Sequence, residues 1–156
     1  MCSSDLFDLR DLYQQVIVDH NKSPRNFGKL EKFNHEADGY NPLCGDRLHV
    51  YLNVNDAGLI EDVSFEGEGC AISVASASLM TEAVKGTPLS EFSAKFDIFQ
   101  HMVTADLSEV PDEEVLGKLA VLSGVREFPS RIKCAVLCWH TLKSAVTDSD
   151  EVAKTE

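Results

Sequence analysis

The chain has 156 residues, of which 44% are hydrophobic and 26% are charged, and it carries a formal net charge of −12 and five cysteines. A chain of this size can bury a sizeable core as one domain without disulfides, and its excess of acid disfavours nucleic acid and anionic lipid as partners. The longest apolar run, Cys134 to Trp139, is far shorter than the roughly 20 residues that span a membrane, so we expect no membrane segment.

The start of the chain, Met1 to Asp8, lacks the basic end and the apolar stretch of a secretory signal. We therefore expect a cytoplasmic protein whose cysteines stay reduced. In a reducing compartment, metal ligation, thiol chemistry or simple burial explains several cysteines better than disulfides do. We expect one domain over residues 1–156, with flexible tails at 1–5 and 148–156.

A first helix is predicted to begin after Ser4 or Asp5, either of which can cap it, and to end between Asn21 and Pro24. Apolar residues recur along it at the spacing of one buried helical face: Leu6, Leu9, Leu12, Tyr13, Val16 and Ile17. The sequence from 26 to 43 carries no clear pattern.

A hairpin is predicted next. Apolar residues alternate with polar ones, which is typical of a half-buried strand. The apolar set is Leu48, Val50, Leu52 and Val54, and the set expected to meet water is Arg47, His49, Tyr51 and Asn53. Residues 55–58 favour a turn, and Leu59, Val63 and Phe65 are predicted to share one face of the returning strand.

The rest of the chain is predicted to be mostly helical. Helices are expected over 71–85, with Gly86 as the stop, over 89–103, over 115–122, and from Pro129 or Ser130 to about 146. The buried positions expected on the later helices are Phe92, Phe96, Phe99, Val103, Val115, Leu116, Leu119, Leu122, Ala135, Trp139, Leu142 and Val146. The acidic segment 104–114 is predicted to be a solvated connection between helices. This order of elements predicts an α+β fold, in which a small antiparallel sheet of about three strands packs against several helices.

Four cysteines lie within this folded region, and two of them flank the hairpin. Cys44 precedes the first strand in a loop rich in Pro and Gly, and Cys70 follows the second strand. Because the start of one antiparallel strand and the end of its neighbour lie at the same edge, Cys44 and Cys70 can meet there. Asp46 can turn toward the same point, since Gly45 leaves the backbone free to fold.

Converging thiolates and a carboxylate suit a tetrahedral zinc site, with Cys134 of the last helix as the remaining ligand. The alternative is that these cysteines are small buried core residues, because free cysteine is among the most buried residue types and no C-x-x-C pair is present. Asp46 is interpreted either as a ligand or as a neighbour that tunes metal release.

Three separated motifs resemble the IscU/NifU-like iron–sulfur assembly family. They are Asn41-Pro42-Leu43-Cys44-Gly45-Asp46, then Gly69-Cys70-Ala71-Ile72-Ser73 running on to Glu82, and Arg131-Ile132-Lys133-Cys134-Ala135. Their order matches the family, and the likeness extends from the first helix, with Asp19 and His20, to Leu142. The resemblance implies a SufE/NifU-like fold and a role in iron–sulfur cluster assembly.

Two departures resemble the SufU branch of that family. A scaffold of the IscU kind has a histidine directly before its last cysteine, whereas this chain has Lys133, and the stretch from Cys70 to Cys134 is longer than in those scaffolds. The branch implies zinc as cofactor, with ligands Cys44, Asp46, Cys70 and Cys134. Zinc, three thiolates and one carboxylate sum to a formal charge of −2, which Arg131 and Lys133 are expected to compensate.

The resemblance also implies a mechanism and partners. A cysteine desulfurase of the SUF type would place a ligand of its own on the zinc and free Cys44 to accept persulfide sulfur, and downstream iron–sulfur assembly proteins would receive it. Cys44 is the expected catalytic residue because it lies on a loop. Two alternatives remain: an IscU-type scaffold that assembles a 2Fe–2S cluster on the same cysteines, and a zinc-stabilised adaptor whose thiols do no chemistry.

The remaining candidate ligands carry weaker signals. Cys138 lies one turn beyond Cys134 and is interpreted as a small buried residue, with a resolving thiol or spare ligand as the alternative. Cys2 belongs to the tail. The other conceivable ligands match no ligand position of the family: His20, His35, His49, His101 and His140.

Overall fold

The computed structural model describes residues 13–42, 45–106, 108–109, 113–147 and 153–154. A first helix covers the described residues 13–22. The later elements are β1 (His35–Asn41), β2 (Asp46–Val54), β3 (Ile60–Glu68), α2 (Ala71–Val84), α3 (Leu89–Thr104), α4 (Glu113–Leu116), the 3-10 helix η1 (Gly117–Glu127), α5 (Pro129–Val146) and β4 (Ala153–Lys154). The capping and apolar positions expected between Ser4 and Leu12 lie outside the described residues.

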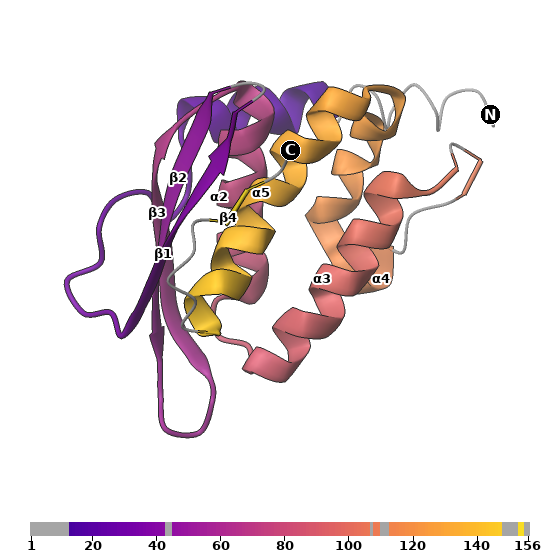
Figure 1. Cartoon of the computed structure of the whole chain (residues 1–156). Helices are drawn as coiled ribbons and strands as arrows, with labels where there is room; N and C mark the ends of the chain where they lie inside the picture. The colour runs from indigo at the N-terminus through magenta and orange to yellow at the C-terminus, as the bar shows by residue number, and fades with distance from the viewer. Residues whose placement is uncertain (1–12, 43–44, 107, 110–112, 148–152, 155–156) are drawn as a thin grey trace.

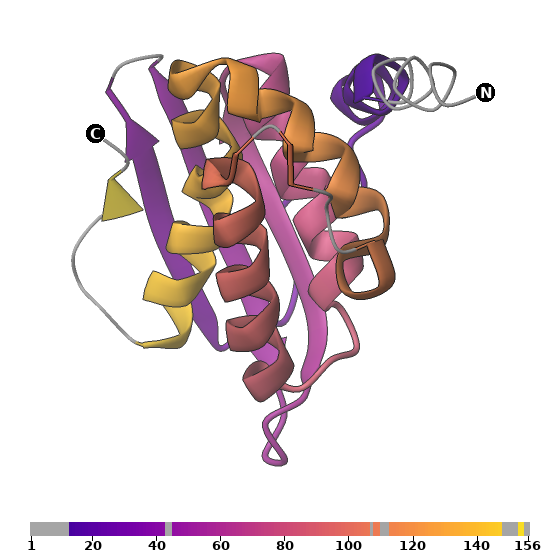
Figure 2. The ribbon, with the colours of Figure 1, turned by 90° about the vertical axis from the view of Figure 1, so that its right-hand side faces the viewer.

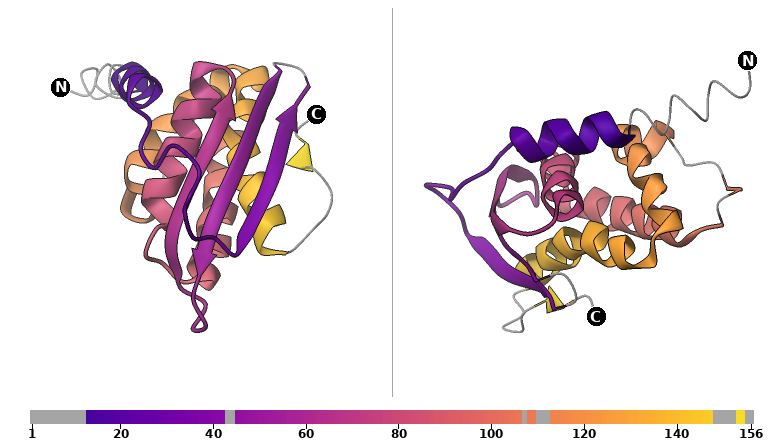
Figure 3. Two further views of the ribbon diagram at one scale, coloured as in Figure 1. Left: turned by 90° about the vertical axis from the view of Figure 1, so that its left-hand side faces the viewer. Right: turned by 90° about the horizontal axis from the view of Figure 1, so that it is seen from above.

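The sheet has the strand order β3-β2-β1-β4, with β1, β2 and β3 antiparallel to their neighbours and β4 parallel to β1. Helices α2, α3 and α5 lie on one face of the sheet, as Figures 1 and 2 show. The chain between the first helix and β1 crosses the other face (Figure 3, left). The α+β expectation is confirmed, and β4 is a short additional strand that the sequence did not indicate.

The predicted hairpin is confirmed, but the faces of two residues differ from expectation. The β2–β3 pairing shifts register between Asn53 and Val54, so Ile60 is fully buried while Leu59 forms an isolated bridge to Pro88. Tyr51 was expected to meet water, yet it is only 5% exposed because the ring of Phe33 lies 5.0 Å away. Contacts with residues outside the hairpin, Pro88 and Phe33, therefore account for both differences.

Strand β1 lies in the stretch to which the sequence assigned no element. Its buried face has Gly39 where an apolar side chain would be expected, because a Cβ there would come within 1.9 Å of Thr141 Oγ1 on α5. The glycine lets the strand and the helix approach closely. It also removes the apolar signal by which a strand is recognised in a sequence.

The predicted helices are confirmed, with one change of type. Helix α2 is followed by Gly86 at φ +81°, the left-handed conformation expected of a helix stop. The helix expected over 115–122 is the short α4 followed by the 3-10 helix η1, and Val115 is 38% exposed rather than buried. In the described part of segment 104–114, the guanidinium of Arg126 donates to the carbonyls of Asp106 and Glu109.

The core lies between the sheet and the helices. Trp139 of α5 is fully buried, and its ring stacks on three phenylalanines of α3, with centroids 5.0–5.8 Å away: Phe92, Phe96 and Phe99. This confirms the expectation that the Trp139 face of α5 is buried. None of the described helices is long and apolar enough to cross a membrane.

Candidate metal centre

Three of the predicted ligands converge at one edge of the sheet. Asp46 begins β2, Cys70 precedes α2 and Cys134 lies in α5, and one ligand atom from each lies within 4.8 Å of the other two. Asp46 and Cys134 are 0% and 1% exposed, while Cys70 is half-buried. The fourth predicted ligand, Cys44, lies outside the described residues, and described residues 42 and 45 flank it.

The Asp46 carboxylate is held by two donors. The backbone N–H of Cys70 donates to Oδ1 at 2.8 Å, and the amide of Asn41 donates to Oδ2 at 3.2 Å. A Cβ at Gly69 would lie 2.5 Å from Oδ1, so only glycine leaves room for the carboxylate here. The local sequence around Cys70 therefore fixes the position of Asp46.

Cys70 caps helix α2 with its side chain. Its Sγ accepts the backbone N–H of Ser73 at 3.4 Å. A hydrogen bond from the Cys134 thiol lowers the pKa of Cys70 to about 7, and backbone N–H groups of the first turn assist, against burial and the charge of Asp46. Helix N-termini favour anions, so this position suits a thiolate.

Cys134 lies in the second turn of α5, on its buried side. Its Sγ accepts a hydrogen bond from the Asn41 amide at 3.5 Å and lies 3.6 Å from the carbonyl oxygen of Ser130. Strand β1, through Asn41, and helix α5 thus jointly orient this thiol.

The residues present fit a zinc ion. Two thiols and a carboxylate are typical zinc ligands, and three such groups in contact repel one another once ionised unless a cation lies between them. They leave one position of a tetrahedron for a further ligand, and Cys44 is the candidate. These residues would hold zinc, while the identity of the metal stays a prediction.

The two basic residues near Cys134 differ in their surroundings. The guanidinium of Arg131 lies 4.2 Å from the centre of the Phe128 ring, and its side chain is exposed. Lys133 is half-buried and directly precedes Cys134. Charge compensation at the cluster remains a prediction for both residues.

Cys138 is part of the core rather than of the cluster. It is fully buried, and its Sγ lies 3.5 Å from the Ser76 hydroxyl. Burial raises the pKa of this thiol to about 12, which makes it a poor ligand and nucleophile. The interpretation of Cys138 as a small buried residue accounts for these contacts.

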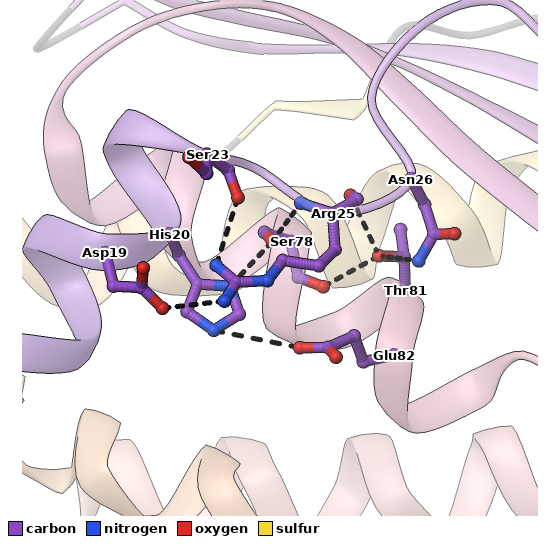
Figure 4. Close-up of polar contacts among 8 residues, drawn as sticks. All are labelled: Asp19, His20, Ser23, Arg25, Asn26, Ser78, Thr81 and Glu82. Carbon is purple, nitrogen blue, oxygen red and sulfur yellow. Dashed lines mark hydrogen bonds and ion pairs between the residues drawn. The ribbon is translucent and has the colours of Figure 1, made fainter.

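His20 belongs to a separate polar network that joins the first helix to α2 (Figure 4). Its Nδ1 lies 2.7 Å from the Ser78 hydroxyl, which also accepts the backbone N–H of Arg25 at 2.8 Å. Its Nε2 lies 3.7 Å from a carboxylate oxygen of Glu82. Burial lowers the pKa of His20, and the charge of Arg25 lowers it further.

The other histidines also have partners away from the cluster. His35 contacts the carbonyl of Ala145 at 3.1 Å, His101 contacts Glu109 at 2.8 Å, and His140 packs edge-on against Phe96. His49 lies on the outer face of the sheet.

His49 contacts two carboxylates on β1, Asp38 and, at 2.9 Å, Glu36. Burial disfavours the protonated imidazole, but the hydrogen bonds to the two carboxylates outweigh it and raise the pKa of His49. An imidazolium between carboxylates is an ion-pair cluster, and it needs no metal.

The sequence did not identify two residues that build the site, Asn41 and Gly69. Both lie in the motifs quoted above, but neither carries a ligand atom typical of zinc sites, so residue type alone did not single them out. Gly69 directly precedes the predicted ligand Cys70 at the end of a predicted strand, whereas Asn41 lies three residues before Cys44 in a stretch with no predicted element. Their roles depend on contacts across the sheet.

Comparison with known proteins agrees with this geometry. The NifU-like N-terminal domain matches residues 12–135. The zinc-dependent sulfurtransferase SufU of Bacillus subtilis (strain 168) is 43% identical over 92% of this chain and 95% of its own length. The iron–sulfur cluster assembly scaffold protein IscU of Streptococcus pyogenes serotype M1 is 42% identical over 92% of this chain and 88% of its own length.

Solved structures share the fold as well. The crystal structure of FiSufU from Fervidobacterium islandicum AW-1 superposes with a TM-score of 0.77 at 36% identity, covering 86% of this chain and 96% of that chain. The expected resemblance is thereby confirmed in sequence and in fold. The chain belongs to the NifU-like N-terminal domain family, in which it groups with the SufU and IscU proteins.

Proposed function

We propose that this protein is a zinc-dependent sulfurtransferase, which accepts persulfide sulfur from a cysteine desulfurase for iron–sulfur cluster assembly. The observation that carries the proposal is the convergence of Asp46, Cys70 and Cys134 within 4.8 Å, at the edge of the sheet where the loop with Cys44 begins and ends. The SufU relative, which is named a zinc-dependent sulfurtransferase, supports it.

Zinc bound by Cys44, Asp46, Cys70 and Cys134 would keep the thiols deprotonated and restrain their reactivity. The chemical step itself is an exchange at sulfur. The Cys44 thiolate attacks the outer sulfur of the donor's persulfide, a new S–S bond forms on Cys44, and the old S–S bond breaks. The donor cysteine leaves as a thiolate with the electron pair, so the step needs no oxidant.

Cys44 is the proposed acceptor because the other groups of the site are less accessible. Asp46 and Cys134 are almost fully buried, and Cys70 caps α2 through its sulfur. The loop that carries Cys44 is closed by the Gly45 N–H, which donates to the Asn41 carbonyl at 2.8 Å. Gly45 adopts φ +71°, a conformation that glycine reaches without strain.

The proposed partners follow from this chemistry. A cysteine desulfurase of the SUF type supplies the persulfide, and downstream iron–sulfur assembly proteins take up the sulfur. The proposed chemistry needs reduced thiols, which the cytoplasm maintains, so we place the protein there.

A scaffold function is the second candidate, because the Streptococcus relative named as a scaffold is 42% identical. In that case the same cysteines would hold a 2Fe–2S cluster. Lys133 argues for the sulfurtransferase, since a protonated lysine has no lone pair for a metal. Protein that stays colourless with one zinc supports the sulfurtransferase, while a stable brown cluster after anaerobic reconstitution supports the scaffold.

The test is persulfide transfer from a SUF-type desulfurase, measured together with zinc content. We expect Cys44→Ala to reduce sulfur acceptance at least ~100-fold, because the nucleophile is removed. Cys138→Ala is the matched control, since it removes a thiol of the same helix as Cys134 that lies outside the cluster. Sulfur acceptance by Cys44→Ala at the wild-type rate would refute the proposal, and zinc binding without any transfer in the wild type would favour the adaptor.

A further inference from the structure

We propose that Asn41 is a positioning residue of the metal centre, which holds Asp46 and Cys134 at ligand spacing and donates a hydrogen bond to each. The inference deepens the proposed function, since it concerns the same site. It assigns a role to a residue that carries none of the thiolate, imidazole or carboxylate ligands typical of zinc.

The backbone of Asn41 lies next to Asp46 and at the start of the loop that contains Cys44 in the sequence. It is the last residue of β1 and pairs directly with Asp46, the first residue of β2. Its carbonyl accepts the Gly45 N–H at 2.8 Å and so closes the loop that contains Cys44. One residue thereby joins the loop to the strand that carries Asp46.

The side chain of Asn41 extends this connection to α5. It is fully buried, and its Nδ2 lies 3.2 Å from Asp46 Oδ2 and 3.5 Å from Cys134 Sγ. An amide NH2 group has two N–H donors, so it can serve both acceptors at once. The opposite orientation of the amide would turn its oxygen toward a carboxylate and a sulfur, and both acceptors therefore select the orientation observed.

The electrostatics of the site explain why a neutral double donor is useful there. Asp46 and Cys134 are both acidic groups held in a buried place, where unpaired negative charge is costly. A hydrogen bond to each lowers the cost of keeping them close before a metal binds. With zinc, three thiolates and the Asp46 carboxylate the formal charge would be −2, so the same donors remain favourable in the loaded site.

The experiment measures binding of Zn²⁺ and Co²⁺ to the full chain, without any desulfurase. We expect Asn41→Ala to weaken Zn²⁺ affinity by about 10–100-fold in a chelator competition, the usual effect of losing a group that orients a ligand. Asn41→Asp, which is nearly isosteric but replaces the donor by an acceptor, should weaken it at least as much. In both variants the sulfur-to-Co²⁺ charge-transfer band should move to lower energy, because the thiolate loses a hydrogen bond.

Asn26→Asp is the matched control. The Asn26 amide donates to Thr81 Oγ1 at 3.0 Å, in the contact between α2 and the segment that follows the first helix, so this variant loses a comparable bond far from the cluster. It should keep the wild-type affinity and band position. Circular dichroism checks the fold, and if Asn41→Asp fails to fold, Asn41→Ala decides because it adds no charge.

The outcomes separate this inference from the proposed function. Wild-type Zn²⁺ affinity and an unmoved Co²⁺ band in the folded Asn41 variants would overturn the positioning role, even if the wild type transfers sulfur. A wild type that binds neither ion would overturn it as well. Weaker binding with a moved band supports the role of Asn41, even if sulfur transfer is absent and the proposed function fails.

Discussion

Two polar clusters lie at different points along helix α2 and differ in how their groups are satisfied. The first, at the start of the helix, consists of Asp46, Cys70 and Cys134. The second, farther along, joins His20 to Ser78 and Glu82 (Figure 4). Both connect α2 to segments distant in the sequence.

In the second cluster, donors and acceptors match. His20 is 2% exposed and its two ring nitrogens face a hydroxyl and a carboxylate, while Ser78 also accepts a backbone N–H. Burial lowers the pKa of His20, so the neutral imidazole is favoured. A closed network of this kind stabilises the packing of the first helix and has no need of a ligand.

In the first cluster, by contrast, groups that become anionic face one another. Asn41 and backbone N–H groups supply donors, but three ligand atoms of acidic side chains still converge within 4.8 Å. Such an arrangement is favourable only when protons or a cation neutralise it. Burial of polar groups is thus common to both clusters, and the surplus of acceptors is what distinguishes a candidate metal site from a structural network.

The largest expected effect separates the two clusters by metal binding. Cys134→Ala should weaken Zn²⁺ affinity more than ~100-fold, because it removes a ligand. Ser78→Ala should leave the affinity unchanged and lower the free energy of unfolding by about 1–3 kcal/mol, because it leaves buried partners unsatisfied. Chelator competition and urea unfolding measure the two effects, and loss of zinc in Ser78→Ala would break the distinction.

A smaller effect is expected at Gly69, which makes room for the Asp46 carboxylate. Gly69→Ala would place a Cβ 2.5 Å from Asp46 Oδ1, so we expect a loss of about 1–3 kcal/mol in stability and roughly 10-fold weaker Zn²⁺ binding. Gly58→Ala is the control, since its φ is +83° with no atom within 4 Å. It should cost about 1 kcal/mol of stability from backbone strain but leave the affinity unchanged. Equal Zn²⁺ affinities in the two variants would contradict the role of Gly69.

The smallest effect concerns pH and sharpens the description of the second cluster. The folded-state pKa of His20 lies below the ordinary 6.5, so below pH 6.5 the unfolded chain binds more protons and stability falls until pH reaches the folded-state pKa. Burial lowers the pKa of His140, with Lys143 assisting, and this adds to the same trend. His20→Gln should therefore reduce the loss of stability between pH 7 and 5.5, by at most about 1.4 kcal/mol per pH unit.

His49 provides the control of opposite sign. Its raised pKa contributes stability that is present below pH 6.5 and is lost as pH rises through the folded-state value. His49→Gln should consequently increase the loss of stability between pH 7 and 5.5, because the gain that His49 makes as pH falls to 6.5 is removed. Urea midpoints at both pH values, measured without added metal, check the pair, and an unchanged slope in His20→Gln would refute the assignment.

Much of the fold could be predicted because it rests on local signals. The alternation of Leu48, Val50 and Leu52 and the stop at Gly86 depend on backbone preferences and on side chains near in sequence. Strand β1 could not be predicted, because its buried face has a glycine in place of an apolar residue. Gly39 is needed there for the close approach of Thr141, which lies on a helix about a hundred residues later in the chain. Tyr51 is buried for a similar reason, because Phe33 covers a position that alternation alone assigns to water.

In the candidate site, too, some features could be predicted from the sequence and others could not. Strand direction predicted that Cys44 and Cys70 can meet at one edge, with Asp46 turned toward the same point. The structure brings Asp46 and Cys70 together with Cys134, while Cys44 lies outside the described residues. The roles of Asn41 and Gly69 became visible only in the structure. The spacing of residues along the chain reveals neither a hydrogen bond from β1 to α5 nor the room that a missing Cβ leaves for a carboxylate.

By itself the sequence determined the chemistry available to this protein. It supplied the thiols, the carboxylate, the lysine before Cys134, and the motifs of the family. Only the tertiary structure decided which groups face one another, and so which cluster is closed and which has surplus acceptors. The physical reason is that residue type fixes what a side chain can donate or accept, whereas burial and partners, which come from distant segments, fix whether that capacity is already used.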